Sequence, residues 1–78
     1  MSLLPSQCRA ARGLLGWSQA QLSAASKVAP ATLANFELGK RTPMPNNLAA
    51  IRGALETAGV IFVDENGEGP GVRLRKNT

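Results

Sequence analysis

Residues 18–41 read SQAQLSAASKVAPATLANFELGKR, and this stretch decides the predicted fold. Ser18 and Gln21 have the spacing of a capping box, in which two side chains satisfy two backbone donors at the start of a helix. Trp17 and Leu22 flank this cap at the two positions of a hydrophobic staple. The pattern therefore predicts that a helix begins here.

A second helix is predicted after a short connection. Pro30 favours a first helical turn, because the N–H that it lacks has no partner there. Gly39 supplies a helix end. We therefore expect helices over about residues 18–26 and 30–38. Two helices this short, joined so closely, must cross steeply, which predicts a helix-turn-helix.

The flanking sequence predicts two more helices. Pro5 suits a first helical turn and Gly16 a helix end, which predicts a helix over about residues 5–15. Apolar residues at helical spacing predict another helix over about residues 45–58, ended by Gly59.

The C-terminal part changes to a β pattern. A β-prone run at residues 60–63, a Gly-rich segment and an alternating run at residues 72–75 predict a hairpin over about residues 60–75. A lone hairpin is unstable in water, so it must either fold back on its own helices or join strands of a second subunit. We expect pairing across a two-fold axis, because Val72 and Leu74 offer an apolar face beside an unpaired edge.

Length and composition limit the function. The chain has 78 residues, which predicts one domain over residues 1–78, and no weight is placed on Met1 to Leu3. With no His and one Cys, His-based catalysis, an internal disulfide framework and most zinc sites are excluded. We therefore expect no enzyme activity, no metal and no cofactor. No apolar run approaches a membrane span and no secretory signal is visible, so we expect no membrane partner and a cytoplasmic location.

The placement of charge indicates the kind of partner. The net charge is +4, and residues 1–41 carry five basic side chains against one acidic side chain, so the whole excess lies in this half. A basic half indicates a polyanion, most often nucleic acid. A solvated basic surface would have the same composition, so charge alone leaves both interpretations open.

Residues 15–22 and 33–41 together resemble the lambda-repressor-like helix-turn-helix family, also called the XRE or Cro type. The resemblance covers roughly residues 6–58. Its most specific parts are Gln19, one residue after the helix cap, and the Glu-x-Gly-Lys-Arg sequence that closes the second helix of the motif. The resemblance implies a mostly α-helical, four-helix DNA-binding domain, here followed by a C-terminal β-hairpin that lies outside the family core.

The resemblance also implies which residues contact double-stranded DNA. The helix that begins at Gln19 would lie across the DNA backbone, and the helix that begins at Pro30 would enter the major groove. Gln19 would donate to a phosphate at the helix N-terminus, and Lys40 and Arg41 would contact phosphates. The alternatives are a solvated first-turn residue for Gln19 and plain surface solubility for the two cations. The implied DNA-binding residues are Ser18, Gln19, Lys27, Ala31, Thr32, Asn35, Lys40 and Arg41.

Several positions depart from the family pattern. Lys27 stands where relatives often carry Gly in the turn, and Ala29 stands where a capping Ser or Thr is usual. Ala31 can at most contact a thymine methyl group, which leaves Thr32 and Asn35 as polar readers. We therefore expect weak direct readout per half-site, with reliance on dimerisation and DNA shape.

Other residues of this half are implied to be structural. The resemblance pairs Arg12 with Glu37 as a largely buried ion pair, which fixes helix placement more surely than it adds stability. Trp17 is expected in the core, and Cys8 is expected to be an inert buried thiol on an apolar helix face.

The leading hypothesis is a sequence-specific transcriptional regulator, a repressor, that acts as a homodimer on two half-sites about one helical turn apart. The alternative is a protein-interaction module, such as the antitoxin half of a toxin–antitoxin pair, whose hairpin holds a toxin-like protein partner. Steeply salt-dependent DNA binding would favour the first hypothesis. Co-purification of a small protein would favour the second.

Overall fold

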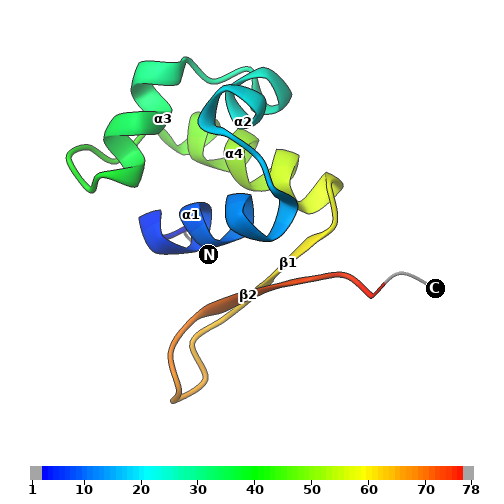
Figure 1. Ribbon diagram of the computed structural model, residues 1–78. Coiled ribbons are helices and arrows are strands. Elements are labelled where there is room, and N and C mark those ends of the chain that lie inside the picture. The colour runs from blue at the N-terminus through cyan, green and yellow to red at the C-terminus, as the bar shows by residue number, and fades with distance from the viewer. Residues whose placement is uncertain (1–2, 77–78) are drawn as a thin grey trace.

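A computed structural model describes residues 3–76 as four helices followed by a two-stranded hairpin. The elements are α1 (Pro5–Leu15), α2 (Gln19–Ser26), α3 (Pro30–Glu37), α4 (Pro45–Thr57), β1 (Val60–Val63) and β2 (Gly71–Leu74). Figure 1 shows the helices gathered on one side of the hairpin, whose loop points away from them. The predicted fold class, mostly α-helical with a C-terminal hairpin, is therefore confirmed.

The start of α2 has the predicted capping box. The N–H of Gln21 donates to Oγ of Ser18 at 3.1 Å, and the N–H of Ser18 donates to Oε1 of Gln21 at 2.8 Å. By contrast, α3 begins without a side-chain cap, because Ala29 occupies its N-cap position. The first turn of α2 therefore has a side-chain cap, and the first turn of α3 has none.

Glycines in the left-handed region follow α1 and α3. Gly16 has a φ of 69° and Gly39 a φ of 76°, which side chains with a Cβ rarely adopt. After α3, the N–H of Lys40 donates to the carbonyl oxygen of Asn35 at 2.9 Å, which is the long bond of a Schellman motif. This bond keeps Lys40 close to the last turn of α3.

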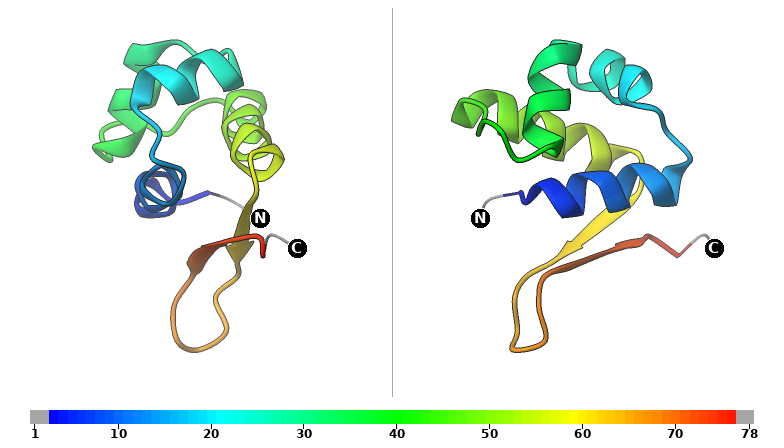
Figure 2. Two further views of the ribbon diagram at one scale, coloured as in Figure 1. Left: turned by 45° about the vertical axis from the view of Figure 1, so that its right-hand side comes forward. Right: turned by 60° about the vertical axis from the view of Figure 1, so that its left-hand side comes forward.

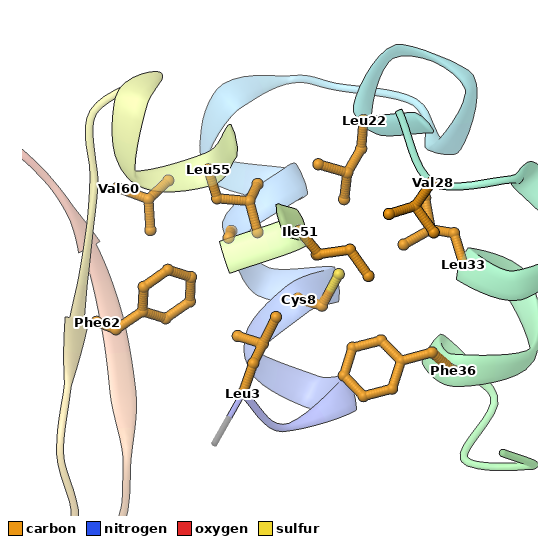
Figure 3. Packing of buried hydrophobic residues seen from close by; sticks show 11 residues of the cluster. Leu3, Cys8, Leu22, Val28, Leu33, Phe36, Ile51, Leu55, Val60 and Phe62 are labelled. Atoms are coloured by element: carbon orange, nitrogen blue, oxygen red, sulfur yellow. The ribbon is translucent and has the colours of Figure 1, made fainter. Parts of the chain in front are cut away.

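The core lies between the helices and the inner face of the hairpin (Figure 3). Leu3 belongs to it at 4% exposure, although we placed no weight on Met1 to Leu3 in predicting the fold. Trp17, which we expected in the core, is only half-buried and packs against the core from outside. It lies just before α2 and lines a groove between α2 and α4, which leaves part of its side chain exposed. The buried apolar residues are Leu3, Cys8, Ala11, Leu22, Val28, Leu33, Phe36, Ile51, Leu55, Val60 and Phe62.

The hairpin folds back on the helices of its own chain. β1 and β2 are antiparallel, with Phe62 opposite Val72, and both side chains belong to or pack against the core. The buried Gln7 of α1 donates Nε2 to the carbonyl oxygen of Gly71 at 3.2 Å. The structure therefore shows the hairpin packed on its own chain. Pairing of a strand edge with a second copy stays a prediction.

The helices are short. α4 has 13 residues and is the longest of them. Within residues 3–76 no helix has the length and apolar character needed to cross a membrane. In the same range no three or more His, Cys, Asp or Glu side chains gather where they could hold a metal ion.

Candidate nucleic-acid interface

The carboxylate of Glu37 joins three helices at the end of α3, where its side chain is 2% exposed. Arg12 of α1 donates Nε to Oε2 at 2.7 Å and Nη2 to Oε1 at 2.6 Å. Gln19 of α2 donates Nε2 to Oε1 at 2.9 Å, and the thiol of Cys8 donates to Oε2 at 3.0 Å. This network fixes the first turn of α2 against the last turn of α3.

The network also changes the pKa values of its members. Burial acts to raise the pKa of Glu37, but the hydrogen bonds from Arg12, Gln19 and Cys8 and the charge of Arg12 outweigh it, so this pKa lies below its ordinary value. The hydrogen bond to Glu37 raises the pKa of Arg12. Burial, followed by the Glu37 carboxylate, raises the pKa of the Cys8 thiol. At neutral pH the ion pair is therefore fully charged and the thiol is protonated.

Gln19 is half-buried at the start of α2 and has two roles available to it. Its carboxamide nitrogen carries two N–H donors, and Glu37 accepts one of them. The first turn of a helix also presents backbone N–H groups that no residue of the helix accepts, at the positive end of the helix dipole. The second amide hydrogen and these backbone groups together suit an anion.

The outer face of α3 is open. Ala31 and Asn35 are exposed, and Thr32 is half-buried beside them. Leu38, the C-cap residue, keeps a helical backbone and is 68% exposed. At 100° per residue, Ala31, Asn35 and Leu38 lie within about 60° of one another around the helix axis. Leu38 was not among the residues predicted for this surface. Its position seven residues after Ala31 could have indicated it, because residues seven apart lie on the same face of a helix.

Figure 2 shows α2 and α3 at the end of the molecule that lies away from the hairpin loop. Exposed cations flank these two helices in the sequence. Lys40 and Arg41 follow α3, Lys27 lies between α2 and α3, and all three are exposed, as is Ser18. Glu37 is the one acidic residue within residues 18–41, and its charge is buried against Arg12. The exposed charged side chains of residues 18–41 are therefore all positive.

Comparison with known families agrees with this geometry. A family model described as Helix-turn-helix matches residues 9–59, which run from α1 to the turn after α4. The chain belongs to the helix-turn-helix family. Within that family it is of the XRE, lambda-repressor-like type that the sequence resembled, and it is a DNA-binding protein. A search of curated proteins found no match to the chain.

Serine hydroxyls stabilise the turn of the helix-turn-helix, in which Lys27 has a φ of 61°. Ser26 Oγ donates to the carbonyl oxygen of Leu22 at 2.8 Å and accepts the N–H of Val28 at 3.3 Å. Ser23 Oγ donates to the carbonyl oxygen of Val28 at 2.6 Å. The turn thus keeps the left-handed shape that relatives reach with Gly, and the role of the serines was not predicted from the sequence.

Lys27→Gly is expected to raise the free energy of unfolding by about 0.5–1 kcal/mol, because Gly adopts this φ without strain. The same change is expected to weaken duplex binding, because it removes a cation beside α3. Urea unfolding and duplex titration measure the two effects. Lys27→Gln separates them: it should lower affinity and leave stability nearly unchanged. If Lys27→Gly were less stable than the parent, the backbone at Lys27 would not be strained.

Proposed function

We propose that this helix-turn-helix protein is a sequence-specific transcriptional repressor that acts by occupying an operator. The observation that best supports this proposal is the open face of α3. Ala31 and Asn35 are exposed there, and the exposed charged side chains of residues 18–41 are all positive. A helix of this kind fits the major groove, where Ala31, Thr32 and Asn35 meet base edges. Occupying an operator requires no chemical step.

The other residues of the site position the protein on the DNA. In this proposal α2 lies across the backbone, and Ser18 and Gln19 meet one phosphate at its N-terminus. Lys27, Lys40 and Arg41 meet neighbouring phosphates. Contacts to phosphate fix the register of the protein but carry no sequence information, so α3 supplies the specificity.

Titration of a duplex of random sequence tests the proposal. The logarithm of affinity is expected to fall linearly with the logarithm of salt concentration, by about 0.9 for each phosphate neutralised. Duplexes enriched from the random pool are expected to bind more tightly than the pool itself. Affinity that does not change with salt, or a pool without enrichment, would contradict sequence-specific operator binding.

The repressor is proposed to act as a homodimer on two half-sites. α3 has eight residues and thus a length of about 12 Å, so one copy reaches few base pairs. Two copies about one helical turn apart double that contact. The proposed pairing surface is the edge of β2, where Val72 is half-buried and Leu74 is 44% exposed.

Leu74→Asp is expected to convert the dimer to a monomer, because a carboxylate would be buried at the apolar seam. Sedimentation equilibrium measures the mass, and circular dichroism checks that the exposed position tolerates the change. Asn46→Asp, which adds the same charge at an exposed position on α4, is the control and should leave the mass unchanged. A dimer that survives Leu74→Asp refutes this pairing surface.

A further inference from the structure

The outer face of α3 combines apolar readers with a single exposed amide. We propose that this face reads A·T base pairs, with Ala31 and Leu38 contacting thymine methyl groups and Asn35 bonding to adenine. The proposal rests on the operator binding proposed above and adds the base composition that the operator must have. It also assigns a specificity-determining role to Leu38.

The position of Leu38 is the first observation. A single exposed leucine is ordinary on a protein surface. This one, however, is 68% exposed and continues the stripe of Ala31 and Asn35 with helical backbone angles. Any duplex that lies against Ala31 and Asn35 therefore also meets Leu38. The C5-methyl group of thymine is the apolar feature that the major groove presents to such a side chain.

The side chains missing from α3 are the second observation. Guanine is read by Arg or Lys donating to O6 and N7, and cytosine by a carboxylate accepting from N4. α3 carries neither Arg nor Lys. Its one carboxylate, Glu37, is buried and bonded to Arg12. Asn35 is exposed, and an amide matches N6 and N7 of adenine. Thr32 is half-buried and its hydroxyl can bond to either kind of pair, so it adds no preference. The face therefore matches A·T pairs and lacks the charged groups that read G·C pairs.

The length of the stripe defines how much DNA it reads. Ala31 and Leu38 are seven residues apart, about 10 Å along a helix. At about 3.4 Å per base pair this distance corresponds to about three steps of the duplex. Asn35 lies between the two apolar residues. Each half-site is thus expected to hold a short A·T segment with thymine at both ends and adenine within it.

The test starts from the full-length protein and duplexes enriched from a random pool. The enriched duplex is resynthesised with deoxyuridine in place of single thymidines, which removes only the methyl group. Each contacted methyl is expected to contribute about a fourfold change in affinity. Replacing adenine with 7-deazaadenine removes the N7 acceptor and is expected to weaken binding separately. Deoxyuridine outside the half-sites is the control and should have no effect.

Two variants connect each effect to its residue. Leu38→Ala should abolish the deoxyuridine effect at one position and keep the 7-deazaadenine effect, whereas Asn35→Ala should do the reverse. Both positions are exposed, so urea unfolding should show parental stability. Enrichment of G·C half-sites, or tight binding that deoxyuridine leaves unchanged, overturns the inference while operator binding stands. Absence of binding to any duplex overturns both.

Discussion

Glu37→Gln is expected to lower the free energy of unfolding by about 3–5 kcal/mol, because it leaves the Arg12 guanidinium without its carboxylate. The side chain of Glu37 is 2% exposed, so water cannot take the place of the lost carboxylate beside Arg12. A small domain has a total stability of about 5–15 kcal/mol, so this loss is a large fraction of the total. Urea unfolding followed by circular dichroism measures the loss.

Glu56→Gln is the matched control. Glu56 pairs with Arg52 across one turn of α4 at 3.3 Å, but its side chain is 44% exposed. Removing an exposed partner costs less than about 1 kcal/mol. If the two glutamate variants lose equal stability, the Glu37 network does not hold the three helices together.

Acid should reproduce part of the Glu37→Gln effect. The pKa of Glu37 is lower in the folded chain than its ordinary value of 4.5. The stability that this group contributes is therefore complete above its unfolded pKa and is lost as the pH falls through its folded pKa. Unfolding free energies measured from neutral pH downward should fall less for Glu37→Gln than for the parent. An identical fall in both proteins would exclude Glu37 as a source of acid sensitivity.

The helix-turn-helix could be predicted because its signals are local. The Ser18–Gln21 cap and the left-handed turn at Gly39 each involve residues within a few positions of one another. Such short-range geometry is encoded in the spacing of residue types. The Gln19 and Glu-x-Gly-Lys-Arg positions then identified the family, which the match over residues 9–59 confirmed.

The parts that were missed depend on contacts distant in sequence. Gln7 bonds to Gly71 across 64 positions, and Cys8 bonds to Glu37 across 29. Gln7 and Cys8 are residue types found on many helix faces. The spacing of residues along the chain therefore could not predict their hydrogen-bond partners. For the same reason the sequence could not decide whether the hairpin packs on α1 or on a second subunit. A strand of alternating apolar residues fits any apolar surface. Leu3 likewise became a core residue only through the tertiary fold.

The second large effect is expected at the cations after α3. Lys40→Gln combined with Arg41→Gln should weaken duplex binding on the order of 60-fold at about 0.1 M salt for each bound subunit, because two phosphate contacts are lost. Both positions are exposed and make no ion pair among residues 3–76, so the fold should be unaffected. Titration of the same duplex at several salt concentrations gives both the affinity and its salt dependence.

The salt dependence identifies where the DNA lies. Misfolding would also lower affinity, but loss of two phosphate contacts lowers the slope of log affinity against log salt by about 1.8 per subunit. Arg73→Gln combined with Arg75→Gln removes the same charge from two exposed positions, one in β2 and one just after it, so it controls for net charge alone. Its slope should match the parent if the duplex contacts the helix-turn-helix. An equal decrease in slope for the hairpin variant would place phosphates along β2 and contradict the α2–α3 interface.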